Sequence, residues 1–252
     1  MARHAQIEFG DIGHKTDEEL NGAVIIGFDI DWAPDFILKD SLELAKTWGI
    51  KPTLFFTHES PLCNRIFKQN RFEFGLHPNF EKLLSGDWSN GQDALEVLNR
   101  LDQSFPGVKI IRSHSLTTSS KLKALFNKAS YEIESSFVTQ GTGKRFPNYW
   151  DEWTGLRQVP ITWEDDIWFS SDRKPVEIDM LEIVKKDTLN VLTFHPIHLF
   201  LNTVNHRHYE ESKSWMGHAA NLMKCRNDGQ VGVRSIFERV GALLNGEKDA
   251  RC

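Results

Sequence analysis

The sequence predicts a single α/β domain built around a parallel sheet. Short apolar segments alternate with longer amphipathic stretches along most of the chain, and this alternation is typical of βαβ units. At 252 residues, the chain has the length of one large α/β domain. Apolar residues make up 40% of it and charged residues 26%, which is ordinary globular composition and allows a substantial core.

The first predicted strand covers residues 23–28, a segment apolar enough to be buried on both faces of a parallel sheet. Six later segments have a strand-like pattern. They cover residues 53–57, 72–76, 108–111, 131–134, 158–162 and 190–194. The sequence therefore predicts seven strands.

Amphipathic helices are predicted between these strands. Pro34 can open the first of them, because its missing N–H costs nothing in the first turn, and apolar residues then recur at helical spacing up to Gly49. The last such stretch, near the C-terminus, would cover the outside of a barrel. The later helical patterns cover residues 94–101, 122–129, 178–184 and 233–244.

Charge and cysteine content exclude several classes of protein. The net charge of -5 comes without a basic run, so the electrostatic footprint of a nucleic-acid-binding protein is missing. The first twenty residues lack the apolar centre of a signal peptide, and no apolar stretch is long enough to span a bilayer. Cys63, Cys225 and Cys252 are far apart and odd in number, which fits a reducing compartment. We therefore expect a cytoplasmic protein without a membrane span.

Polar side chains gather at the carboxyl ends of the predicted strands. In parallel α/β folds these ends form one face, where ligands bind. We therefore expect residues that are far apart in sequence to converge there. In chain order they are Asp29 and Asp31, His58, His77, Arg112 and His114, Glu164 and Asp166, and His195 and His198.

Asp29 and Asp31 place two carboxylates where the first strand ends, so that one could bind a cation while the other acts as a base. An exposed turn with helix-capping acids would give the same pattern. His77 follows an apolar strand and precedes Pro78, and a neutral imidazole at this place could bind a divalent metal. It could equally be a hydrogen-bonded residue of the core.

Arg112 is suited to orient a carboxylate through paired hydrogen bonds, and Asp29 is its obvious partner. The alternative is an exposed ion pair, which would contribute little to the stability of the fold. His195 ends the last apolar strand as a candidate general acid or base. The acids at 164–166 could accept its other ring proton, although such a cluster is more often a solvated loop.

These segments together resemble the polysaccharide deacetylase family, also called the NodB-homology carbohydrate esterases. The resemblance covers roughly residues 24–199 and implies a distorted (β/α)7 barrel, with a domain over residues 23–247 after an N-terminal extension over residues 1–22. Three sequences, Asp-Ile-Asp-Trp-Ala-Pro, Leu-His-Pro-Asn-Phe and Phe-His-Pro-Ile-His, look closest to a divergent branch found in bacterial surface-polysaccharide gene clusters.

The resemblance also implies roles for single residues. In the family, an Asp pair after the first strand supplies a base and a metal ligand, which here would be Asp29 and Asp31. Arg112 matches the arginine that steadies the base. His195 matches the histidine that acts as general acid, and Asp166 falls where the family has an Asp that tunes it.

The second family motif departs from its usual form. It normally holds two metal-binding His four residues apart, and His77 matches the first. Glu81 stands in place of the second and Asn79 lies between them, so either could bind through oxygen, or His114 could supply the imidazole. We prefer His114, because it keeps a set of one Asp and two His and because the proline after His77 disfavours the standard two-His turn. The resemblance implies a divalent metal ion, and zinc is the ion that we expect.

The expected function is the metal-dependent hydrolytic removal of an N-acyl group from an amino sugar or a surface-polysaccharide precursor. The acyl group that we expect is acetyl. Trp32, Asn79, Trp163 and His198 are the expected contacts with the carbohydrate. Another amide hydrolase on the same fold is one alternative. A glycan-binding homologue without activity is the other, because the second His of the motif is missing.

Overall fold

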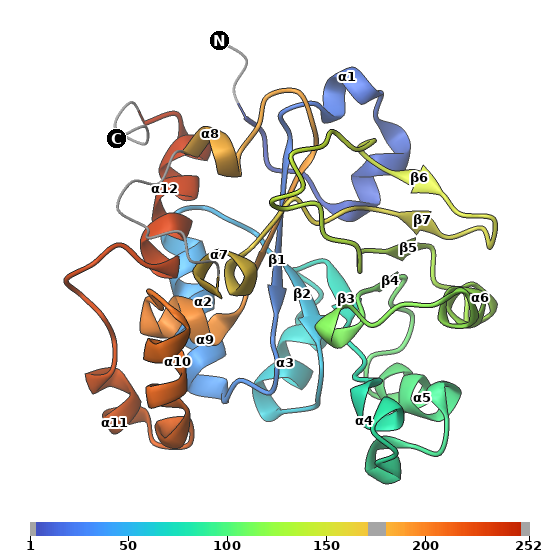
Figure 1. The fold of residues 1–252 in the computed structure, drawn as a ribbon, viewed down its shortest axis with the longest axis horizontal. Helices are drawn as coiled ribbons and strands as arrows, with labels where there is room; N and C mark the ends of the chain where they lie inside the picture. Colours follow the sequence, from blue (N-terminus) through green and yellow to red (C-terminus); the bar gives the residue numbers. More distant parts are fainter. Residues whose placement is uncertain (1–3, 171–179, 248–252) are drawn as a thin grey trace.

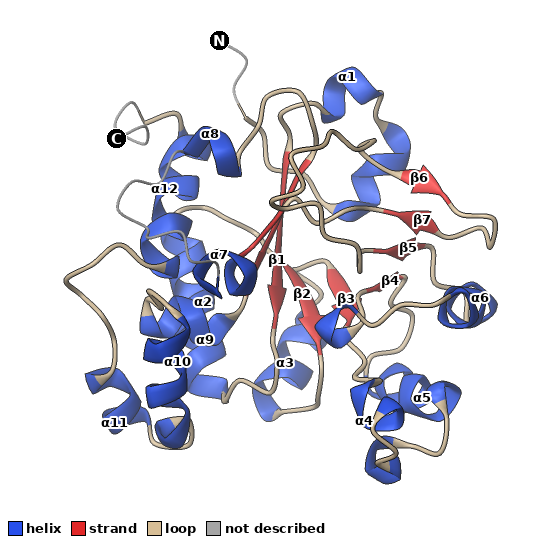
Figure 2. Ribbon diagram, viewed as in Figure 1, coloured by secondary structure: helices blue, strands red, loops and turns tan. Residues whose placement is uncertain are grey.

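The computed structural model describes residues 4–170 and 180–247, which include one curled, mixed β-sheet with helices packed around it (Figures 1 and 2). The strand order is β6-β7-β5-β4-β3-β2-β1-β9-β8. The strands are β1 (Val24–Asp29), β2 (Thr53–Phe56), β3 (Phe74–Leu76), β4 (Ile110–Ile111), β5 (Ile133–Glu134), β6 (Trp150–Asp151), β7 (Arg157–Gln158), β8 (Trp163–Glu164) and β9 (Asn190–Phe194). Of the paired strands, β6 and β7 are antiparallel and the others are parallel.

In place of the sixth predicted strand, over residues 158–162, the structure has two short strands near opposite edges of the sheet. β7 pairs with β5, whereas β8, five residues further on, pairs with β9. Between them Ile161 forms a bridge to Val138 beyond β5, and Pro160 has no N–H for a continuous ladder. Residues 157–164 thus bring the two sides of the curled sheet together, which confirms the predicted α/β fold as a single, barrel-like domain.

Helices cover the outer surface of the sheet. The longer ones are α2 (Asp35–Thr47), α3 (Pro61–Gln69), α5 (Ala94–Ser104), α6 (Ser120–Lys128) and α12 (Val233–Asn245). The shorter helices and 3-10 turns are η1 (Phe9–His14), α1 (Asp17–Leu20), α4 (Glu81–Leu84), η2 (Trp88–Asn90), η3 (His114–Leu116), α7 (Asp165–Ser170), α8 (Met180–Ile183), α9 (Pro196–Leu201), α10 (His206–Ser212), η4 (Lys213–Trp215) and α11 (Ala219–Lys224).

The predicted helices correspond to α2, α5, α6, α8 and α12. α2 begins directly after Pro34 and ends before Gly49, whose φ of 67° is left-handed, as expected for a helix stop. Of the predicted helix over 178–184, Ile178 lies outside the described residues. Within the described ranges no helix has the length and apolar character needed to cross a bilayer.

The sheet separates two hydrophobic cores, because side chains alternate along each strand. Val24 and Ile26 of β1 belong to the core shared with the helices, whereas Ile25 belongs to the core inside the curl, together with Phe55 and Val191. This alternation on strands buried on both faces explains why they are apolar nearly throughout.

The N-terminal residues close the amino end of the inner core. Phe9, Ile12 and Leu20 are fully buried there, and the Phe9 ring lies edge-on to Phe55 with centroids 5.9 Å apart. The Glu73 carboxylate accepts the backbone N–H of Phe9 at 2.9 Å. The opposite, carboxyl end carries the polar residues.

Candidate active site

The structure brings Asp29 and Arg112 together beneath the carboxyl ends of the strands. Arg112 Nη1 donates to Asp29 Oδ1 at 2.8 Å and to Thr193 Oγ1 at 3.0 Å. Arg112 Nε donates to the carbonyl oxygen of Ser135, and the guanidinium lies over the Phe55 ring. Both charged side chains are buried, so this is not the exposed ion pair that the sequence left as an alternative.

Three histidines surround the Asp31 carboxylate. The Nε2 atom of His77 lies 3.2 Å from Asp31 Oδ1. The Nε2 atoms of His195 and His114 lie 3.4 Å and 3.6 Å from Asp31 Oδ2. These residues follow β1, β3, β4 and β9, so the predicted convergence of strand ends is present. Burial alone would raise the pKa of Asp31, but its contacts with His114 and His77 hold it well below the usual range.

When its ring is neutral, His77 presents a lone pair to Asp31. Its Nδ1 lies 2.7 Å from the carbonyl oxygen of Arg112, and because a carbonyl can only accept, Nδ1 carries the proton. In the neutral ring, Nε2 is then an acceptor that faces Asp31 Oδ1, an atom buried without a hydrogen-bond partner among the described residues. Two acceptors that face each other at 3.2 Å fit a shared cation, so these residues fit a metal.

Glu81 orients His114 toward the same place. Glu81 Oε2 lies 3.2 Å from His114 Nδ1, which leaves Nε2 directed at Asp31. Burial would lower the pKa of His114, but Asp31 and Glu81 together raise it. Asn79 Oδ1 accepts the backbone N–H of Glu81 at 2.8 Å and so holds the turn before α4. Of the three candidates for the missing ligand, this geometry favours His114.

His195 is held by Asp165. The Asp165 carboxylate accepts from His195 Nδ1 at 2.7 Å and from the His195 backbone N–H at 2.8 Å. Burial would lower the pKa of His195, but Asp166 and Asp165 raise it well above its usual value. Asp166, the residue assigned from sequence, lies 3.8 Å from Nδ1. It therefore acts on His195 by charge, and the direct partner is the preceding residue.

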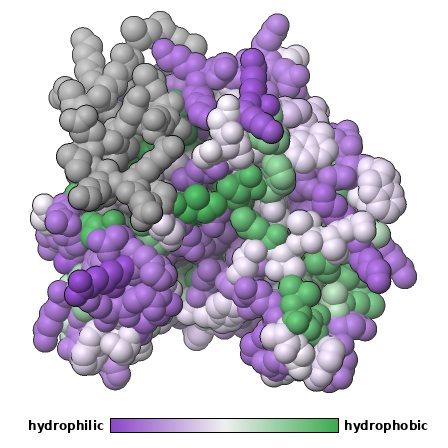
Figure 3. Space-filling model, in the orientation of Figure 1, coloured by the Kyte–Doolittle hydropathy of each residue, from purple (hydrophilic) through white to green (hydrophobic). Residues whose placement is uncertain are grey.

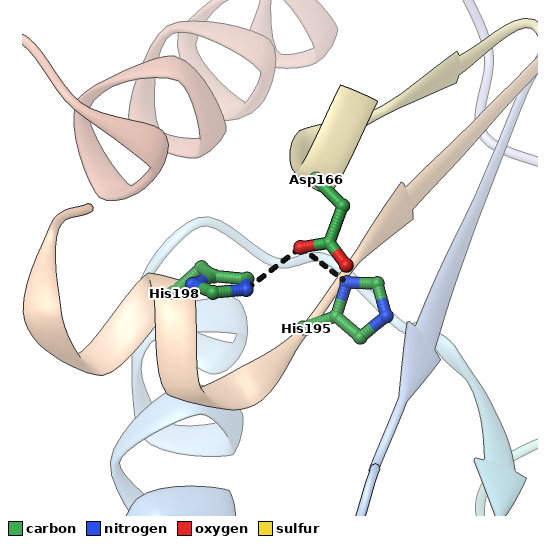
Figure 4. A group of neighbouring side chains, drawn as sticks. All are labelled: Asp166, His195 and His198. Carbon is green, nitrogen blue, oxygen red and sulfur yellow. Dashed lines mark ion pairs between the residues drawn. The ribbon is translucent and has the colours of Figure 1, made fainter. Parts of the chain in front are cut away.

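Asp166, His195 and His198 form a second group that could hold a metal (Figure 4). Their ligand atoms lie within 4.8 Å of one another, and Asp166 Oδ1 is 2.7 Å from His198 Nε2. The ring nitrogen of His195 that faces Asp166 is Nδ1, at 3.8 Å, and this atom already donates to Asp165. His198 is 2% exposed, so it supports Asp166 and does not form a wall of the pocket.

The two tryptophans expected to contact a sugar differ in position. Trp32 is 45% exposed and stands edge-on to His114, with ring centroids 5.1 Å apart. Trp163 is 3% exposed and packs against Phe194 in the outer core, with centroids 5.0 Å apart. The expectation that Trp163 faces the pocket was therefore wrong, because its strand turns this side chain toward the helices.

Two strained loops carry the residues around Asp31. Asp31 and Trp32 have φ of 43° and 56°, and Ser115 and Leu116, directly after His114, have φ of 50° and 53°. Consecutive left-handed residues other than glycine are uncommon and cluster at functional sites. Contacts between the loops, such as that of Trp32 with His114, help to hold both in place.

Comparisons with known proteins identify the family of the chain. A candidate polysaccharide deacetylase of O-antigen biosynthesis (WbmS) from Bordetella bronchiseptica has 31% sequence identity and a TM-score of 0.83, over 94% of this chain and 97% of that chain. A candidate polysaccharide deacetylase from Mycobacterium smegmatis has 14% identity and a TM-score of 0.46, over 98% and 96% of the two chains. Among curated proteins, none matches the chain. The model of the WbmS-like polysaccharide deacetylases matches residues 26–213, and the chain belongs to this family.

Proposed function

We propose that the protein is a metal-dependent deacetylase that hydrolyses an N-acetyl group of an amino sugar in a surface polysaccharide or its precursor. The observation that carries this proposal is the close approach of His77 Nε2 and Asp31 Oδ1, which lie 3.2 Å apart. They lie beside a buried, arginine-bound carboxylate, Asp29. Family membership supports the reaction class.

Asp31, His77 and His114 are the proposed metal ligands. They offer one oxygen and two imidazole nitrogens, a set that suits zinc. A divalent cation supplies Lewis acidity toward water and toward the amide carbonyl. We assign Asp166, His195 and His198 to proton supply, because metal binding at His195 Nδ1 would displace the hydrogen bond to Asp165.

Asp29 is the proposed base. Arg112 binds its Oδ1 and fixes the carboxylate in place, while Oδ2 lies 3.8 Å from His77 Nε2, at the edge of the metal site. A water beside this oxygen would lose its proton to Asp29 as it attacks the amide carbon.

His195 is the proposed acid. Its raised pKa keeps the ring protonated near neutral pH, so its Nε2 proton is available to the departing amine when the C–N bond breaks. Acetate and a free amino group are then the products. Trp32 would stack on the sugar ring beside His114 through its exposed indole.

The test follows acetate release from N-acetylated sugars and sugar nucleotides. Protein stripped of metal should be inactive, and zinc should restore the activity. Asp29→Asn and His195→Ala should each lower the rate by about 10²-fold or more. Activity that survives metal removal and both substitutions would contradict the proposal.

A further inference from the structure

Tyr209 of α10 is an aromatic side chain at the candidate active site to which the proposed reaction assigns no part. Its ring stands edge-on to His198, with ring centroids 4.6 Å apart. His198 Nε2 in turn lies 2.7 Å from Asp166 Oδ1, and the rings of His198 and His195 have centroids 5.6 Å apart. Through His198, Tyr209 is thus one side chain away from the proposed acid and from a carboxylate beside it.

The Tyr209 ring is held in one place by its neighbours. Besides the contact with His198, Lys213 Nζ lies 4.7 Å from the centroid of the ring. The backbone is fixed as well, because α10 is capped by Asn205, whose side chain accepts the His208 N–H at 2.9 Å. A ring fixed in this way presents its hydroxyl at a defined place, which is what recognition of a ligand requires.

The Tyr209 hydroxyl is a hydrogen-bond donor that is available to a ligand. It forms no hydrogen bond within the part of the chain that the structure describes, and the side chain is only partly buried. Burial raises the pKa of Tyr209 to about 12, with a further contribution from Asp166, so the hydroxyl keeps its proton at neutral pH. The charges of His195 and Asp31 also act on it, which indicates that the hydroxyl faces the site.

Tyr209 lies on the side of the site that carries the proposed acid. In the strand order, β9 and β8 are on one side of β1, and β3 and β4 are on the other. His195 follows β9, whereas His77 and His114 follow β3 and β4. In Figure 1, α10 lies at the lower left and α4 at the lower right, with the carboxyl ends of β1 and β2 between them. The acid and the two imidazoles proposed for the metal therefore lie on opposite sides of Asp31, and Tyr209 is on the side of the acid.

The proposed reaction determines which part of the substrate lies on this side. His195 gives its proton to the amide nitrogen, and this nitrogen stays on the sugar when the acetyl group leaves. The ring carbons next to the one that bears the nitrogen therefore lie on the same side of the site as Tyr209. The surface over α10 and α11, at the lower left of Figure 3, is mostly hydrophilic, which suits a ligand rich in hydroxyl groups.

We propose that Tyr209 determines specificity, because its hydroxyl donates a hydrogen bond to the ring hydroxyl that neighbours the acetamido group on the side away from the anomeric carbon. This inference rests on the proposed function. A site that keeps a donor for a substrate hydroxyl discriminates against the analogue without it, because the donor is then left without a partner. The substrates are thus acetamido sugars in which this hydroxyl is free, and sugars that lack it or carry a substituent on it are poor substrates.

The experiment compares the zinc-loaded protein with its variant Tyr209→Phe, which keeps the ring beside His198 and lacks the hydroxyl. The probes are N-acetylglucosamine and N-acetylgalactosamine, each with its analogue deoxygenated at the neighbouring carbon, and acetate release gives kcat/KM. We expect the unchanged protein to prefer the hydroxylated sugar about fivefold or more. Tyr209→Phe should lose this preference, because its rate falls on the hydroxylated sugar alone. An equal loss on both members of a pair, or a preference that survives, would overturn the inference.

Tyr149→Phe is the matched control. Tyr149 precedes the edge strand β6, and its ring lies 4.6 Å from the Arg157 guanidinium and packs against the inner core. This variant should keep both the rate and the preference, and a lost preference here as well would overturn the inference. Tyr209→Phe should also bind zinc as tightly as the unchanged protein. A weaker zinc affinity would make Tyr209 a support of the metal site and contradict a role in sugar recognition.

Sugar binding separates this inference from the proposed function. Saturation-transfer NMR of the zinc-loaded protein with the same four sugars measures binding without acetate release. Binding that depends on the neighbouring hydroxyl and on Tyr209, without any acetate release, would contradict the deacetylase and support the contact. Acetate release without any difference between the members of a pair would contradict the contact and leave the deacetylase intact. No binding of any of the four sugars would overturn the inference.

Discussion

Arg112 Nη1 lies 2.8 Å from Asp29 Oδ1, and the whole Arg112 side chain is buried. The backbone and hydroxyl oxygens of Ser135 and the hydroxyl of Thr193 accept three further hydrogen bonds from the guanidinium. A buried charge pair is costly to desolvate and is tolerated when such hydrogen bonds satisfy it. The proposed base is therefore also a structural element of the barrel.

Replacing Arg112 should destabilise the fold. Arg112→Met leaves Asp29 buried without its partner, and we expect a loss of about 3–5 kcal/mol in the free energy of unfolding. Urea denaturation measures this. Adding Asp29→Asn should recover part of the loss because the unpaired charge is gone, whereas Arg65→Met at an exposed site should change little. A double variant as unstable as the single one would refute this account.

Glu81→Gln should weaken zinc binding. Glu81 contacts His114 Nδ1 at 3.2 Å, and carboxylates that orient a metal-binding His typically contribute 10- to 100-fold in affinity. Competition with a chromogenic chelator measures this affinity. Glu18→Gln, on the exposed face of α1, is the control. If Glu81→Gln binds zinc as tightly as the unchanged protein, His114 is not held for a metal in this way.

Asp165→Asn should shift the pH dependence of kcat. The acid form of His195 is needed, and the carboxylates of Asp166 and Asp165 raise its pKa, so activity should be lost only as pH rises through this raised value. Without the Asp165 charge the pKa falls, and the alkaline limb should move to lower pH. A pH profile with zinc held constant tests this. Asp187→Asn at an exposed position should keep the original limb, and an unmoved limb in Asp165→Asn would argue against His195 as the acid.

Glu164→Gln should stabilise the protein most at alkaline pH. Burial raises the pKa of Glu164 from 4.5 to about 8, so the folded state holds this proton more tightly than the unfolded state. Its contribution to stability is complete below about pH 4.5 and is lost as pH rises through about 8. Urea denaturation of the metal-stripped proteins at pH 5, 7 and 9 should show a growing advantage of the variant, a few kcal/mol at most. Parallel pH curves would show that Glu164 titrates normally.

The strands and the convergence of their ends were predictable from the sequence, because both depend on local pattern. A strand buried on both faces must be apolar throughout, as β1 and β9 are, and parallel strands bring their carboxyl ends to one face. The alignment of Asp31 with three histidines follows from this rule.

Details set by tertiary register were not predictable. Trp163 faces outward because the strand is interrupted at Pro160 and the chain resumes as β8 beside β9. No local sequence pattern indicates which face of the sheet the side chains of β8 then occupy. The same holds for the acids that follow. α7 begins at Asp165, and only the position of that helix decides that Asp165 and not Asp166 contacts His195 directly.

The paired left-handed residues at Asp31–Trp32 and Ser115–Leu116 store backbone strain in two loops of the site. Each such residue costs about 1–3 kcal/mol, so these loops can open locally while the sheet stays intact. On heating, loss of function should then precede loss of secondary structure. Warm, inactive protein would keep its far-UV circular dichroism and regain activity on cooling with zinc.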